Sequence, residues 1–229
     1  MFKTLPCDLS IEYLNASFDA NQIREQYSSD QEDRCRKLIK FGVAALILDD
    51  NDRALVVEHE ARDGEYGQNA LGPSMETSRY VPAYGAGMTE KPLETLLRCI
   101  DEELPNEEFS TIQERISAAE LFIARDSIVS FDEWDIGVNS TGDSDFYAAV
   151  SICLRTSNPD VLLPSRRSEE ALSAFFLPIE AVLSSTNTRP GFIGWLNQMS
   201  DRLVSDRTSV MPISCPEVLP VTGPDVRFD

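Results

Sequence analysis

The sequence predicts a fold of the α+β (α/β) class, in which a mixed sheet is layered with a few helices. Short apolar segments typical of strands alternate with amphipathic segments typical of helices. A turn rich in Asp and Asn joins the first two apolar segments and indicates an antiparallel hairpin. With 229 residues, the chain has the length of one large domain, or of one domain with extensions.

The first elements are a candidate helix and three strands. The charged stretch 22–40 is only partly amphipathic and is the candidate helix. The hairpin strands are expected within 41–50 and 53–61, and a third strand is expected over 70–80. A Gly-rich stretch, YGAGMTEKP, then leads into the next helix.

The helix predicted over 91–104 has the clearest pattern. Its apolar residues recur at helical spacing, and they are Leu93, Leu96, Leu97, Ile100 and Leu104. Pro92 suits the first turn of a helix, and Pro105 ends the pattern.

The second half of the chain is expected to contain two strands, a strand that leads into a helix, a last helix and a tail. The strands lie over 116–128 and 146–156, separated by an acidic segment with Asp132, Glu133, Asp135, Asp143 and Asp145. The strand and helix pair lies over 169–183, and an amphipathic helix lies over 190–204. Evenly spaced prolines from Pro212 to Pro224 predict an extended tail.

The charge is strongly acidic, with 39 Asp and Glu against 20 Lys and Arg and a net charge of −19. Such a surface repels the phosphates of a nucleic-acid duplex and anionic membranes, so neither is an expected partner. A small anionic ligand is compatible with this charge if metal ions neutralise the site.

The cysteines and apolar runs indicate a cytoplasmic protein. The 5 cysteines are widely spaced and form no CxxC pair, which argues against a disulfide framework and a zinc knuckle. The N-terminal segment has no apolar core of signal-peptide length, and the longest apolar runs are too short to span a bilayer.

The informative charges lie on the helix predicted over 91–104. Glu94, Arg98 and Glu102 are each four residues apart, so Arg98 can bridge the carboxylates above and below it. This pattern is also what a solvated ladder of ion pairs produces. The adjacent carboxylates Glu102 and Glu103 repel each other unless a cation lies between them, and Mg²⁺ takes such oxygen ligands.

This region resembles the Nudix box, G-x5-E-x7-R-E-U-x-E-E-x-G-U, where U is a bulky apolar residue. Glu90 and Arg98 match E-x7-R, Ile100 matches U, and Glu102-Glu103 match the paired E-E within the run RCIDEE. The resemblance implies a Nudix-like α/β/α sandwich over 41–183, with an N-terminal extension over 1–40 and a C-terminal helix and tail over 184–229.

The chain departs from the box at three positions. Cys99 replaces the glutamate that follows the arginine, Pro105 replaces the closing glycine, and Tyr84 stands at the opening glycine. In the family, the missing glutamate is a metal ligand and sometimes the base that activates water. A neutral thiol does not replace it for Mg²⁺, which prefers oxygen.

The resemblance implies catalytic roles for Arg98, Glu102 and Glu103, with Mg²⁺ or Mn²⁺ bound by Glu102, Glu103 and a further carboxylate, Glu120. Other acids available to complete a metal site are Glu76, Asp143 and Asp145. Arginines suited to phosphate groups of the substrate are Arg62 and Arg79, with Arg125 as a further candidate. His59, between Glu58 and Glu60, is expected to be partly exposed and paired with a carboxylate.

Two functions stay open. The first is a Mg²⁺-dependent Nudix-type hydrolase that cleaves the pyrophosphate bond of a nucleoside diphosphate linked to another group. The alternative is a catalytically inactive Nudix-derived module that binds a nucleotide or a protein. Cys99 and Pro105 favour the module, whereas Arg98 and the glutamate pair favour the hydrolase. A homodimer or a protein partner also stays open.

Overall fold

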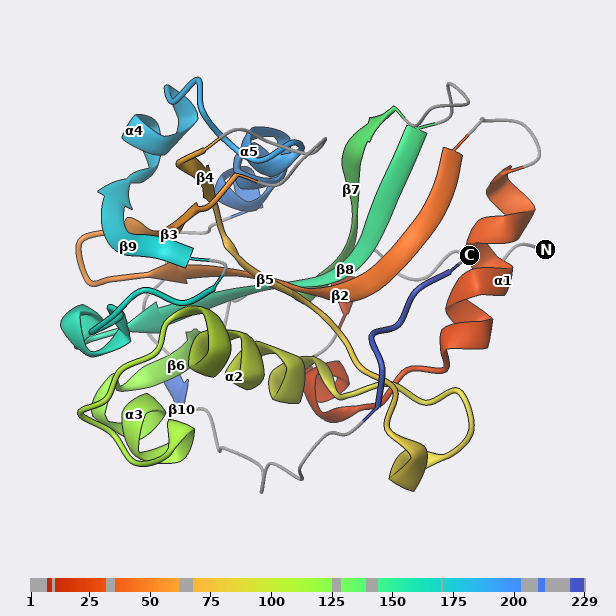
Figure 1. Cartoon of the computed structure of the whole chain (residues 1–229), viewed down its shortest axis with the longest axis horizontal. Coiled ribbons are helices and arrows are strands. Elements are labelled where there is room, and N and C mark those ends of the chain that lie inside the picture. The colour runs from red at the N-terminus through yellow and green to blue at the C-terminus, as the bar shows by residue number, and fades with distance from the viewer. Residues whose placement is uncertain are drawn as a thin grey trace.

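The computed structural model describes residues 8–9, 11–31, 36–61, 68–124, 129–138, 144–169, 171–202, 210–212 and 223–228 (Figure 1). The strands are β1 (Asp8–Leu9), β2 (Arg36–Leu48), β3 (Arg53–His59), β4 (Ala70–Gly72), β5 (Ser74–Thr77), β6 (Leu121–Ala124), β7 (Val129–Val138), β8 (Ser144–Thr156), β9 (Ala171–Pro178) and β10 (Val210–Pro212). The α-helices are α1 (Ala20–Gln31), α2 (Pro92–Glu103), α3 (Ile112–Ala118), α4 (Ile179–Leu183) and α5 (Phe192–Arg202). Short 3₁₀ turns are η1 (Ile11–Asn15), η2 (Pro82–Tyr84) and η3 (Pro159–Leu162).

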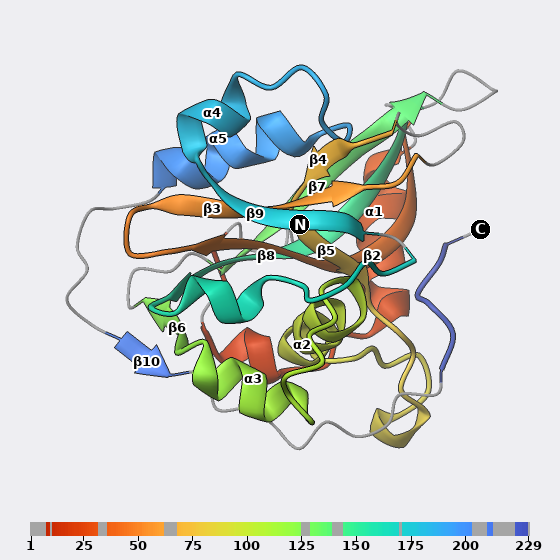
Figure 2. The same cartoon turned by 60° about the vertical axis from the view of Figure 1, so that its left-hand side comes forward.

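The sheet is mixed, and its centre is the parallel pair β2 and β8. Their register runs from Arg36 opposite Ser144 to Leu48 opposite Arg155. β5 and β3 pair antiparallel with β2, while β6 and β7 pair antiparallel with β8. β3 also pairs with β4 and β9. Helices α2 and α3 lie on one side of the sheet and α4 and α5 on the other (Figures 1 and 2). The predicted mixed sheet with flanking helices is confirmed.

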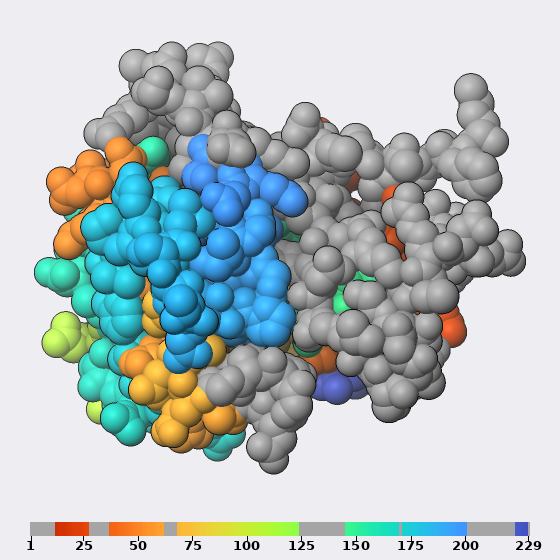
Figure 3. Space-filling model, turned by 90° about the horizontal axis from the view of Figure 1, so that it is seen from above, coloured from red at the N-terminus to blue at the C-terminus, as the bar shows by residue number. Residues whose placement is uncertain are grey.

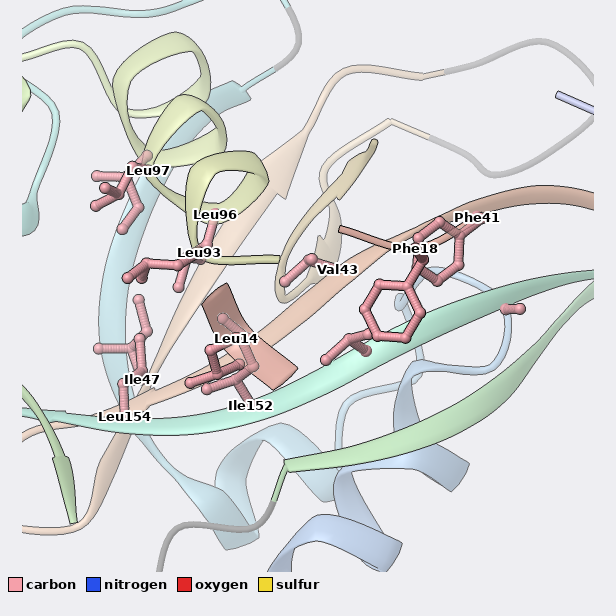
Figure 4. Packing of buried hydrophobic residues seen from close by; sticks show 14 of the residues in the cluster. Leu14, Phe18, Phe41, Val43, Ile47, Leu93, Leu96, Leu97, Ile152 and Leu154 are labelled. Carbon is pink, nitrogen blue, oxygen red and sulfur yellow. The ribbon is translucent and has the colours of Figure 1, made fainter. Parts of the chain in front are cut away.

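Alternation along β2 divides the interior into two cores, because successive strand residues point to opposite faces. The side chains that face α2 include Phe41, Val43 and Ile47, all of which are buried. Figure 4 shows Leu93 and Leu96 of α2 pointing toward this face of the sheet. The periodic leucines of the predicted helix therefore bury its apolar face.

The second core lies on the opposite face, under α5. Leu46 and Leu48 of β2 pack there with Phe192 and Leu196 of α5. Figure 3 shows α4 and α5, in cyan and blue, gathered over this face of the molecule. The predicted amphipathic helix over 190–204 is confirmed for α5, and its apolar face is used for packing.

Several predicted elements are confirmed as placed: the hairpin strands, the helix over 91–104, the strand over 146–156, and the strand and helix over 169–183. Two near the start need correction. The candidate helix over 22–40 ends at Gln31, and β2 already begins at Arg36. The single strand over 70–80 is two strands, because Pro73 has no N–H for a ladder and the chain passes there from β3 to β2.

The strand predicted over 116–128 was wrong in its first part. Thr111 caps α3 by accepting a hydrogen bond from the Glu114 amide at 3.2 Å, and only 121–124 is strand before the described residues stop. The acidic segment between the two predicted strands also contains a strand that was not predicted, because 129–138 forms β7. Among the described residues, β7 pairs with β8 on one side and with the two-residue β1 on the other.

Residues outside 41–183 share the same core. Ile23 and Tyr27 of α1 and Val226 and Phe228 of the tail belong to the cluster that contains Phe41. The division into a 41–183 domain with two extensions stays a prediction. In the part of the chain that the structure describes, no helix is both long and apolar enough to cross a membrane.

Candidate functional site at the α2 edge

The first turn of α2 is held by Glu94. Its carboxylate accepts a hydrogen bond from the Lys91 amide at 3.0 Å and from the Tyr84 hydroxyl at 2.7 Å, and the Lys91 ammonium lies 3.3 Å away. Burial, followed by the hydrogen bond to Glu94, raises the pKa of Tyr84. Because Glu94 is committed to the helix start, it does not form the predicted bridge to Arg98.

Arg98 instead forms a buried, two-pronged ion pair with Glu90. Its Nε and Nη2 donate to the two carboxylate oxygens at 3.0 and 2.8 Å, and the side chains are 9% and 1% exposed. Arg98 Nη2 also donates to the Thr77 carbonyl at 2.7 Å. Burial alone disfavours the cation, but the hydrogen bond and charge of Glu90 outweigh it and raise the pKa of Arg98. A solvated ladder is therefore wrong for Arg98.

The third nitrogen of Arg98 faces the surface. Nη1 lies 3.1 Å from Glu102 Oε2 and 3.6 Å from Glu76 Oε2. Arg79 Nη2 lies 3.4 Å from the other oxygen of Glu102, and Arg79 Nε lies 3.8 Å from Asp225. Glu102 is thus an exposed carboxylate shared by two arginines, and the predicted Arg98–Glu102 bridge is confirmed.

Glu103 is directed into the interior. Its carboxylate accepts a hydrogen bond from the Cys99 thiol at 3.3 Å, and both residues are buried. Burial, and then the charges of Glu103 and Glu76, raises the pKa of Cys99 well above its usual range. The contact is one that the spacing of four residues along the helix favours. The adjacent glutamates therefore lie in different surroundings, one exposed between arginines and one buried beside a neutral thiol.

The box positions 99, 102 and 103 do not fit a Mg²⁺ site as they stand. Mg²⁺ takes oxygen ligands, whereas Cys99 offers the sulfur of a protonated thiol. This thiol also donates a hydrogen bond to Oε2 of Glu103, so that oxygen already has a partner. Among the described residues, no group of at least three His, Cys, Asp or Glu side chains is arranged to hold a metal ion.

The remaining predicted residues are scattered. Glu120 lies exposed in the turn between α3 and β6, with φ of 49°. Asp145 is part of β8 rather than of a loop. His59 is 1% exposed, which corrects the expectation of partial exposure, because it lies on the same face of β3 as the buried Val57. Arg62, Arg125 and Asp143 lie outside the described residues.

The sequence did not predict a cavity of about 90 Å³ beside Glu76. Its charged and aromatic lining consists of Lys40, Phe41, Glu76, Tyr147, Arg189, Asp225 and Arg227. Of these, only Glu76 had been singled out. The others come from β2, β8, the segment before α5 and the tail, so no local spacing in the sequence identifies them.

No family model matches the chain, and no curated protein matches it by sequence. It is similar to a Nudix hydrolase from Nitrosomonas europaea, with 16% identity and a TM-score of 0.42 over 74% of this chain and 99% of the other. RenU, a Nudix hydrolase from M. smegmatis, is 11% identical with a TM-score of 0.42 over 72% and 85%. The Nudix domain of Shewanella oneidensis NrtR, complexed with ADP ribose, is 12% identical with a TM-score of 0.40 over 79% and 98%.

Proposed function

We propose that the chain is a Nudix-like module that binds a ligand of the nucleoside diphosphate class without hydrolysing it. The observation that carries this proposal is the buried Cys99–Glu103 hydrogen bond. Cys99 stands in place of one oxygen ligand of the box, and its thiol donates to an oxygen of a second box residue, Glu103. The ion pair between Glu90 and Arg98 is present at the same time. The helix therefore keeps this stabilising contact of the box, although positions 99 and 103 do not offer free oxygen ligands.

The cavity supports ligand binding of this class. Lys40, Arg189 and Arg227 line it together with Tyr147. Glu76 and Asp225 also line the cavity, so three cations face two carboxylates there. In a chain with a net charge of −19, this local excess of positive charge favours an anionic group. The NrtR domain was solved with ADP ribose, which makes ADP ribose a suitable first ligand to test here.

The test is to measure binding and turnover together. Calorimetry with ADP ribose, ADP and inorganic pyrophosphate, with and without Mg²⁺, reports binding, and chromatography of the same mixtures reports products. We expect binding of at least one diphosphate without product and with little dependence on Mg²⁺. Product formed by the wild-type protein, or no binding of any of the three, would overturn the proposal.

A second candidate, metal-dependent pyrophosphate hydrolysis, is favoured by one contact. Glu76 and Glu102 both approach Arg98 Nη1, so Glu76 is a carboxylate close to Glu102 that could replace the missing oxygen ligand. If the wild-type protein turns over a diphosphate, Glu76→Gln should abolish the activity. The homodimer or protein partner and the cytoplasmic location stay predictions.

A further inference from the structure

We infer that the C-terminal segment 223–228, called the strap here, forms part of the ligand site. Arg227 of the strap binds an anionic group, phosphate or carboxylate, in the cavity, so that ligand binding and docking of the strap reinforce each other. The inference rests on the proposed function for the class of ligand and adds the element that regulates the site.

The strap is docked through its backbone. It lies between the start of β2 and residues 78–80, and it is the dark blue segment beside β2 in Figure 1. The Val226 amide donates to the Ser78 carbonyl at 2.8 Å, and the Phe228 amide donates to the Ile39 carbonyl at 3.0 Å. The side chains of Val226 and Phe228 are 0% and 7% exposed. These two residues anchor the strap in the core that contains Phe41.

The alternate residues of the strap line the cavity. Because side chains of an extended chain point to opposite sides in turn, Asp225 and Arg227 lie on the side away from the core. Docking of the strap therefore supplies one of the three cations around the cavity.

The cations are arranged in a way that an anion would stabilise. Arg227 pairs in an antiparallel bridge with Lys40, and residues directly opposite in such a pair have neighbouring side chains. Like charges in this position repel each other. Asp225 Oδ2 lies 3.1 Å from Arg227 Nη2 and offsets part of this repulsion, but the other oxygen of Asp225 lies 3.8 Å from Arg79 Nε. The cavity of about 90 Å³ is several times the ~10–15 Å³ that one water requires, so a small anionic group fits in it.

Docking of the strap also depends on Gly223. A Cβ at this position would lie 1.8 Å from the Tyr80 carbonyl oxygen, which is fixed backbone. Any side chain here must push the strap away from residues 78–80. Gly223→Ala is therefore a variant that weakens docking while every charge of the strap is kept.

The experiment compares the full-length wild type with Arg227→Gln, Gly223→Ala and Arg166→Gln. Arg166 is an exposed arginine paired with Glu107 and serves as the control for loss of one positive charge. Calorimetry with inorganic pyrophosphate and ADP ribose gives the Kd. Hydrogen exchange at the Val226 and Phe228 amides, with and without ligand, reports docking of the strap.

In the wild type, ligand should slow exchange at both amides. Arg227→Gln should raise the Kd by roughly tenfold or more, because a charge-assisted contact is lost, and should abolish this slowing while the empty protein exchanges like the wild type. Gly223→Ala should exchange faster when empty and should also bind more weakly. Arg166→Gln should match the wild type in both measurements.

The two proposals fail in different ways. If the wild type binds a probe but Arg227→Gln and Gly223→Ala bind it equally well, the inference about the strap is wrong and the proposed function stands. If the wild type binds neither probe, the proposed function fails and the anion site fails with it. If binding leaves exchange at Val226 and Phe228 unchanged, the strap is not coupled to the ligand and the inference is wrong.

Discussion

Removal of the charge of Glu90 should destabilise the protein far more than removal of the charge of Glu102, although both carboxylates bind Arg98. Glu90 is 1% exposed and accepts two hydrogen bonds from the guanidinium, whereas the side chain of Glu102 is 45% exposed and takes one. Glu90 also accepts a hydrogen bond from the Arg79 amide at 2.8 Å. The perturbation is the matched pair of variants Glu90→Gln and Glu102→Gln.

The magnitude follows from burial. Breaking a buried ion pair by removing one partner costs about 3–5 kcal/mol, because the remaining charge stays in the interior. Glutamine keeps part of the hydrogen bonding, so we expect about 3 kcal/mol for Glu90→Gln, or roughly 6–12 °C in Tm for a chain of this size. An exposed pair contributes about 0–1 kcal/mol, so Glu102→Gln should lower Tm by less than ~4 °C.

The assay is urea unfolding followed by circular dichroism, supported by thermal melts of the same samples. Both variants should keep the wild-type m-value, so that the midpoints report stability alone. Equal, small losses in the two variants would instead mean that Arg98 is solvated and that Glu90 and Glu102 are equivalent partners.

Three further predictions concern stability. Leu97→Asp should unfold the protein, because it buries a charge and loses about 1.5–3 kcal/mol of apolar burial at a side chain that is 0% exposed, and an unchanged melting temperature would contradict the packing of α2. Arg115→Met should cost about 3 kcal/mol in urea unfolding, because the buried guanidinium donates to the Ile100 and Leu104 carbonyls at the end of α2, and an unchanged midpoint would contradict this role. Burial alone would raise the pKa of Asp49, but hydrogen bonds, chiefly from Arg53, lower it, so its stabilisation is present above the unfolded pKa of ~3.9 and is lost as the pH falls through the lower folded value. The unfolding free energy of Asp49→Asn should therefore fall less steeply below about pH 4 than that of the wild type, and equal slopes would count against the assignment.

The sequence predicts α2 and its internal contacts well because they depend on local spacing. Residues four apart share a helix face, so the contacts of Cys99 with Glu103 and of Arg98 with Glu102 follow from position alone. The same spacing predicted a bridge from Arg98 to Glu94, and this prediction was wrong. That residue lies in the first turn, where its carboxylate binds backbone and hydroxyl donors instead of Arg98.

The cavity and the strap could not be predicted, because they depend on contacts between distant segments. Lys40 and Arg227 are 187 residues apart in the sequence (227 − 40) and become neighbours when the tail docks beside β2. The strand β7 was missed for a different reason. Its acidic composition resembles a loop, although it pairs with β8, the next strand along the chain.

The hydrogen bond from Cys99 to Glu103 should leave the box positions of α2 unable to bind a divalent metal, and calorimetric titration with Mn²⁺ measures this. We expect the wild type and Glu103→Gln to give the same titration, without a site at these positions. Cys99→Glu should create a site by placing an oxygen donor beside Glu103. A wild-type site that Glu103→Gln removes would show that Cys99 and Glu103 do not prevent metal binding.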